Sequence, residues 1–106
     1  MRLSTGFYYH YKHDPNGPIN NYAYEVIGIG HHTESDCRDI DKFVIVYRPL
    51  YASFVYRHGR MFDIRPMQMF TEKVMKDGKA LPRFKKIRDT HRIAELKRIK
   101  KEMYSE

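Results

Sequence analysis

Apolar and polar residues alternate over much of the first 88 residues with the short period of β-strands. Aromatic and β-branched residues dominate these stretches, and turn-forming residues such as Asp14-Pro15-Asn16-Gly17 separate them. Gly28 and Gly30 lie inside one such stretch, where they indicate a bulge or a bend. The pattern predicts strands over residues 6–13, 22–30, 43–50, 53–57, 61–65 and 83–87, and a single helical turn over 67–70.

The period changes near residue 89. Apolar residues then recur every three or four positions, which places Ile93, Leu96, Ile99 and Met103 on one face of a helix. The chain therefore divides into a small β-barrel domain over 1–88 and a basic C-terminal helix or tail over 89–106. The fold class that we predict is mainly β, a small antiparallel SH3-like barrel of about five strands with a C-terminal α-helix. The apolar stripe of that helix docks either on its own barrel or on a protein partner.

Positive charge is concentrated towards the C-terminus. Of the formal net charge of +7, residues 1–71 carry +1 (eight Lys and Arg against seven Asp and Glu), and residues 72–106 carry +6 (twelve against six). A basic segment attracts polyanions through the release of counterions, which makes binding sensitive to salt. The alternative interpretation is a solvated helix whose lysines keep the protein in solution.

Four groups of short motifs follow one another along the chain. They read Gly6-x-Tyr8-x-His10-Tyr11-Lys12; Tyr24-Glu25-Val26-x-Gly28 with His32-Thr33-Glu34-Ser35; Tyr47-Arg48-x-Leu50-Tyr51; and Arg65-Pro66-x-x-Met69-Phe70 with Asp77-Gly78-Lys79 and Pro82-Arg83-Phe84. Through these motifs, residues 6–88 resemble an uncharacterised bacterial and phage family, domain of unknown function 1653. The resemblance implies a compact β fold and brings no established activity. The chain departs from the family pattern where Thr33 and Ser35 are exchanged, and at Asp63, where the family usually has tryptophan.

The polar and aromatic residues of these motifs suit a planar, anionic ligand. Arginine binds phosphate through two hydrogen bonds at once, and tyrosine offers a stacking surface. We therefore predict a non-enzymatic binding module for a phosphate-bearing ligand, either a nucleic acid or a nucleotide. The candidate ligand-binding residues are His10, Tyr11, Lys12, His32, Glu34, Arg48, Tyr51, Arg65 and Arg83. The open alternative is that the arginines pair with Glu25, Glu34 or Asp63 to hold strands together.

Two other functions remain open at this stage. His32 and Glu34 could serve as an acid–base pair in a small enzyme that acts on a nucleotide-like substrate. His10 with these two residues would supply the two histidines and one carboxylate of an iron site, but nothing in the sequence makes them converge, so we expect neither a metal nor a cofactor. The third possibility is a protein–protein adaptor that docks through the apolar stripe of the helix.

Several classes of protein are excluded. The single cysteine, Cys37, rules out an intrachain disulfide framework and a cysteine-only zinc site. No motif of the common nucleotide hydrolases, dinucleotide enzymes, zinc proteases or serine hydrolases occurs. No apolar run approaches the roughly 18 residues of a membrane-spanning helix, and we expect a cytoplasmic protein.

Overall fold

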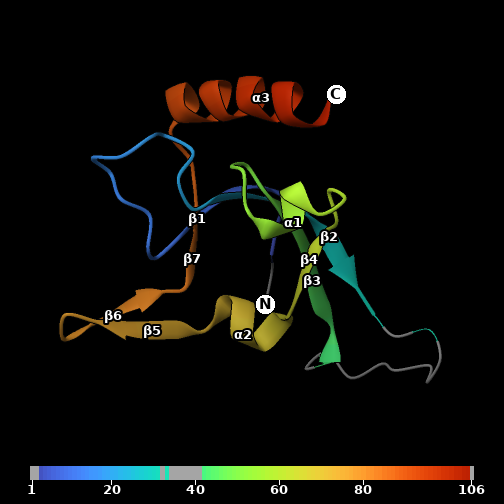
Figure 1. The fold of residues 1–106 in the computed structure, drawn as a ribbon. Coiled ribbons are helices and arrows are strands. Elements are labelled where there is room, and N and C mark those ends of the chain that lie inside the picture. Colours follow the sequence, from blue (N-terminus) through green and yellow to red (C-terminus); the bar gives the residue numbers. More distant parts are fainter. Residues whose placement is uncertain (1–2, 32, 34–41, 106) are drawn as a thin grey trace.

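A computed structural model describes residues 3–31, 33 and 42–105 (Figure 1). Five strands form one antiparallel sheet in the order β4-β3-β2-β1-β7. Their bounds are β1 Gly6–His10, β2 Ala23–Gly30, β3 Val44–Pro49, β4 Asp63–Pro66 and β7 Phe84–Lys86. A separate two-stranded hairpin is formed by β5 Lys73–Lys76 and β6 Lys79–Pro82. The helices are α1 Phe54–Arg57, α2 Met67–Thr71 and α3 Thr90–Tyr104.

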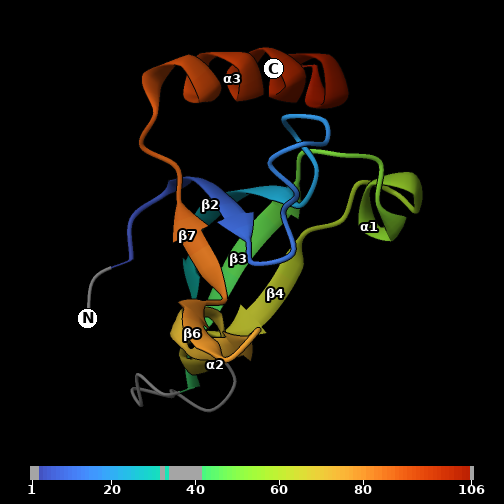
Figure 2. The same cartoon turned by 90° about the vertical axis from the view of Figure 1, so that its left-hand side faces the viewer.

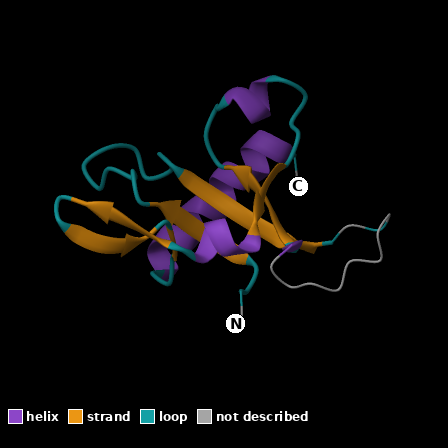
Figure 3. Ribbon diagram, turned by 90° about the horizontal axis from the view of Figure 1, so that it is seen from below, coloured by secondary structure: helices purple, strands orange, loops and turns teal. Residues whose placement is uncertain are grey.

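The sheet lies between α3 on one side and α2 on the other (Figures 1 and 2). Seen from below, α2 is in front of the sheet and α3 behind it (Figure 3). Because successive side chains of a strand point to opposite faces, each strand contributes to both sides. One apolar cluster contains Tyr8, Val26, Ile45, Tyr47, Met67, Phe70 and Phe84. The other contains Phe7, Ala23, Leu50, Ile87 and Leu96. We call the first side the α2 face and the second the α3 face.

The helix predicted from residue 89 is confirmed as α3. The Asp89 side chain accepts a hydrogen bond from the Arg92 backbone N–H at 3.1 Å and so caps the N-terminus. Leu96 is fully buried, and Ile93 and Ile99 pack against the same cluster. The apolar stripe is therefore packed on the protein's own sheet, with Leu96 fully buried and Ile93, Ile99 and Met103 partly exposed.

The prediction of a strand over 53–57 is wrong, because this segment forms α1. A segment of this length is too short for its pattern to decide between strand and helix, and residues 53–57 take no part in either sheet. The backbone satisfies its hydrogen bonds locally instead: the N–H of Arg57 donates to the carbonyl of Ser53, and that of His58 to Phe54. The predicted strand over 61–65 is present as β4, but it pairs with β3 rather than with 53–57.

Other details of the sheet agree with the sequence pattern. The predicted irregularity in β2 is a register shift between Val26 and Gly28, and the helical turn expected over 67–70 is α2. The SH3-like barrel stays a prediction. Among the described residues, the sheet begins and ends with β4 and β7, which are not paired with each other. No helix in the described part of the chain is both long enough and apolar enough to cross a membrane.

Candidate functional site

A row of aromatic rings crosses the α2 face beside the core. His10 lies opposite Phe84 in the β1–β7 pairing, and its ring meets the Phe84 ring edge-on at 5.1 Å between centroids. Tyr24 on β2 lies 5.7 Å from Phe84 and 5.4 Å from Tyr47, also edge-on. We call this set, completed by Tyr22 and Tyr51, the aromatic wall: His10, Tyr22, Tyr24, Tyr47, Tyr51 and Phe84.

Tyr22 and Tyr51 extend the aromatic wall beyond the ends of the strands. The Tyr22 ring lies 5.7 Å from that of His10, nearly parallel to it, and 5.8 Å from that of Tyr51. Tyr22 has a positive φ of 51°, which is unfavourable for a bulky side chain, and its residue is 38% exposed. A strained backbone thus holds a half-exposed ring at the margin of the wall.

Tyr24 and Tyr51 are joined by a hydrogen bond between their hydroxyl groups. Burial raises the pKa of both phenols above the ordinary value, and their hydrogen bond raises that of Tyr24 further. Both side chains are therefore neutral at physiological pH. They offer ring faces and hydroxyl groups to a ligand, and no negative charge.

His10 is neutral as well. Its pKa is lowered to about 4, first by burial and then by the positive charges of Arg65, Lys12 and Arg83. Its Nδ1 accepts a hydrogen bond from the Lys12 backbone N–H at 3.2 Å. In the neutral ring, Nε2 therefore carries the proton and acts as a donor. Three of the predicted cations are close enough to His10 to act on its titration.

Arg65 extends from β4 towards the aromatic wall. Its Nε donates to the Tyr47 hydroxyl at 3.2 Å, and its guanidinium carbon lies 5.7 Å from the centre of the Phe84 ring. Asp63 lies two residues earlier on the same strand, and burial raises the pKa of its carboxyl group although Arg65 opposes the change. Within the described part of the chain, no carboxylate lies within 4.0 Å of the Arg65 guanidinium nitrogens.

Arg83 combines a structural role with its place near His10. Its Nε donates to the Met69 carbonyl at 3.1 Å, and its Nη2 pairs with Glu72 at 2.6 Å. These contacts tie the strand that follows the β5–β6 hairpin to α2. The Tyr11 ring, 4.5 Å from that of His10, and the exposed Lys12 complete the predicted residues on this side.

Arg48 does not join the others, because it faces α3. It is adjacent to Tyr47 on β3, so the two side chains point to opposite faces of the sheet. Its Nε pairs with Glu25 at 3.0 Å, and its guanidinium lies over the Tyr104 ring at 4.0 Å. Glu25 also accepts from Lys100 at 2.7 Å. For Arg48, then, the structure matches the alternative of an ion pair that holds elements together.

His32 and Glu34 lie outside the described residues, so the structure does not bear on the acid–base pair. In the part of the chain that is described, no group of three or more His, Cys, Asp and Glu side chains could hold a metal ion. Four rings of the wall were absent from the predicted site: Tyr22, Tyr24, Tyr47 and Phe84. Tyr24 could have been predicted, because period-two alternation places it on the same face of its strand as Val26. Tyr22 could not, because it lies in the turn before β2 and its position is not set by the strand pattern.

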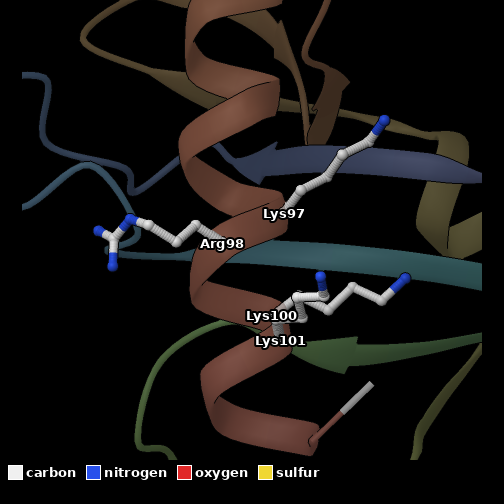
Figure 4. Close-up of a pocket in the computed structure, with 4 residues that line it drawn as sticks. All are labelled: Lys97, Arg98, Lys100 and Lys101. Carbon is white, nitrogen blue, oxygen red and sulfur yellow. The ribbon is translucent and has the colours of Figure 1, made fainter.

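A second positive area surrounds α3. A cavity of about 500 Å³ is lined there by Lys97, Arg98, Lys100 and Lys101. Figure 4 shows the three lysines extending to one side of the helix and Arg98 to the other. Carboxylates offset part of this charge, because Arg98 pairs with Glu95 and Glu102, and Lys100 pairs with Glu25. The aromatic wall is the better candidate, since its cations accompany stacking surfaces.

Comparison with known proteins identifies a family and a similar solved structure. Residues 6–86 match the model of the family described as "Protein of unknown function (DUF1653)". A crystal structure of a DUF1653 protein from Bordetella bronchiseptica is similar, with a TM-score of 0.57 and 27% sequence identity. The similarity covers 80% of this chain and 87% of that chain. No curated protein matches this sequence.

Proposed function

Because the chain belongs to the DUF1653 family, whose description assigns no activity, we propose from its own residues that it is a non-enzymatic binding module for a phosphate-bearing ligand. The ligand is a nucleic acid or a nucleotide. The observation that carries the proposal is the juxtaposition of the aromatic wall with Arg65, whose Nε donates to the Tyr47 hydroxyl and whose guanidinium lies 5.7 Å from the Phe84 ring. Arg83 and Lys12, which adjoin Phe84 and Tyr11 in the chain, add positive charge beside it.

Four residues of this surface contact the ligand directly in the proposal. The rings of Tyr22 and Tyr51 stack on bases, an interaction worth about 1–3 kcal/mol for each base. Arg65 binds a phosphate group through its terminal nitrogens, while its Nε holds the Tyr47 hydroxyl. The Nε2–H of His10 donates to a base or phosphate oxygen without adding charge. Arg48 has no part in this surface.

The arrangement of strands also supports the proposal. Small β-barrels such as OB-folds bind ligands on a sheet face and its loops, and we propose that the margin of the α2 face beside the core, where Tyr22 and Tyr51 are partly exposed, is that surface here. The basic helix α3 adds attraction at longer range, because it raises the local concentration of a polyanion without recognising its sequence.

The proposal is tested by titrating the protein into fluorescein-labelled single-stranded RNA and DNA of about 12 nucleotides, a length within the usual footprint of small β-domains. Fluorescence anisotropy gives the affinity at several salt concentrations. We expect the logarithm of the association constant to fall linearly with the logarithm of the salt concentration. Absence of binding to RNA, DNA and mononucleotides at low salt would refute the proposal.

A further inference from the structure

We propose that the β5–β6 hairpin is a basic arm that extends the site, and that the ligand is consequently a single-stranded nucleic acid several nucleotides long. This inference rests on the proposed function and narrows its ligand class. A mononucleotide would occupy the aromatic wall alone, whereas a strand would continue along the arm.

The hairpin projects away from the five-stranded sheet (Figures 1 and 3). Its register pairs Val74 with Leu81 and Lys76 with Lys79. Residues two apart on one strand share a face, and so do directly opposed residues. Val74, Leu81, Lys76 and Lys79 therefore lie on one face of the hairpin, the two apolar residues near its base and the two lysines at its tip.

The base of this face is continuous with the candidate site. A cavity of about 190 Å³ is lined by Leu81 and Pro82 of the hairpin together with His10, Tyr11 and Lys85, as well as Tyr9 and His13. The Arg83 backbone N–H donates to the Glu72 carbonyl at 3.1 Å and closes the hairpin at its base. With a rise of roughly 3.4 Å for each residue, Lys79 lies about 7 Å beyond Leu81 along the strand.

Lys76 and Lys79 lie directly opposite each other at the tip, with the oppositely charged Asp77 in the turn that joins them. Like charges that lie directly opposite each other destabilise a pair of strands, and an isolated two-stranded hairpin is only marginally stable. Both lysines are exposed. The opposite face of the hairpin carries Lys73 and Met75, and Met75 is 71% exposed. A phosphate group placed between Lys76 and Lys79 would relieve their repulsion.

The aromatic wall determines which form of nucleic acid fits. Stacking on tyrosine requires a base with an accessible face, and the bases of a duplex are already stacked on each other. Single strands, loops and unpaired ends present such faces. The wall and the arm together therefore favour a single strand over a duplex of the same sequence.

The test compares two double variants of equal charge change. Lys76→Gln with Lys79→Gln alters the arm, and Lys97→Gln with Lys101→Gln alters α3 by the same amount. For a single-stranded 12-mer, we expect the arm variant to lose roughly tenfold in affinity and its salt slope to fall by about 1.4, or about 0.7 for each lost phosphate contact. We expect the α3 variant to lose less than threefold, and mononucleotide binding to be unchanged in both.

The test distinguishes a failure of the arm proposal from a failure of the proposed function. If the arm and α3 variants lose affinity equally, or if the arm variant weakens mononucleotides as much as the 12-mer, the arm proposal is overturned while the proposed function stands. Duplex binding as tight as single-strand binding also overturns it. If the wild-type protein binds no nucleic acid or nucleotide, both proposals fail together.

Discussion

The guanidinium of Arg48 lies over the ring of Tyr104, with its central carbon 4.0 Å from the ring centre. Tyr104 belongs to α3, and its hydroxyl donates to the Pro49 carbonyl at 2.6 Å. Arg48 also pairs with Glu25 on the neighbouring strand. The contact therefore joins the last turn of α3 to two strands, which gives Arg48 a structural role rather than a role in binding.

Replacing Arg48 with methionine should lower the free energy of unfolding by about 1.5–3 kcal/mol, the usual value of hydrogen bonds to charged groups. Urea denaturation followed by circular dichroism measures the change. Arg92→Met is the matched control, because Arg92 is exposed on α3, and its loss should be clearly smaller. A folded, fully stable Arg48→Met protein that binds nucleic acid more weakly would show that Arg48 contributes to binding and not to stability.

Sequence alone was informative about elements whose pattern is local. The helical period from residue 89 predicted α3, and the β-branched run before Pro49 predicted β3, because the burial of one face leaves a regular pattern. The prediction of a strand over 53–57 is wrong because a short segment of β-branched and aromatic residues fits either structure. Its expected partner, β4, pairs instead with β3, which is more distant in the sequence.

The titration of His10 gives a second prediction. NMR of the imidazole Cε1–H, with His10→Gln used for assignment, should give a pKa of about 4 instead of the ordinary 6.5, because burial and the cations Arg65, Lys12 and Arg83 disfavour the charged form. The pattern of ring nitrogen signals should show the proton on Nε2. A midpoint near 6.5 would mean that His10 is neither buried nor surrounded by these cations.

This lowered pKa also fixes the sign of a pH effect on stability. Between about pH 6.5 and pH 4, the unfolded chain binds a proton at His10 and the folded protein does not. The contribution of neutral His10 to stability is therefore complete above pH 6.5 and is lost as the pH falls towards 4. His10→Gln should lose less stability over this range than the wild-type protein does.

Tyr22 offers a way to separate binding from folding. Glycine accepts the positive φ at this position, which offsets part of the loss of the ring's contacts with His10 and Tyr51, so Tyr22→Gly should lower the free energy of unfolding by only about 1–2 kcal/mol. The same change removes a stacking ring and should weaken binding of a single strand by about 1–3 kcal/mol. Arg60→Gly is the matched control, because Arg60 also has a positive φ, of 55°. Equal affinities for the two variants would exclude Tyr22 from the site.

The candidate site was only partly predictable. The motifs identified His10, Arg65 and Arg83, which the fold brings near one another. They also included Arg48, because a motif records the order of residues and not the face on which each lies. Period-two alternation places Arg48 and Tyr47 on opposite faces of the sheet. Only the three-dimensional structure shows that Arg48 contacts Glu25 and the Tyr104 ring of α3 on its face.

The central claim is that Arg65 and the aromatic wall form a receptor for phosphate and bases. Its most direct test is the affinity of Arg65→Gln for a single-stranded oligonucleotide, compared with that of Arg57→Gln, which removes an exposed charge on α1. The account predicts at least a tenfold loss for Arg65→Gln, equivalent to about 1.4 kcal/mol, and less than a twofold loss for Arg57→Gln. An Arg65→Gln protein that folds normally and binds like the wild type would contradict it.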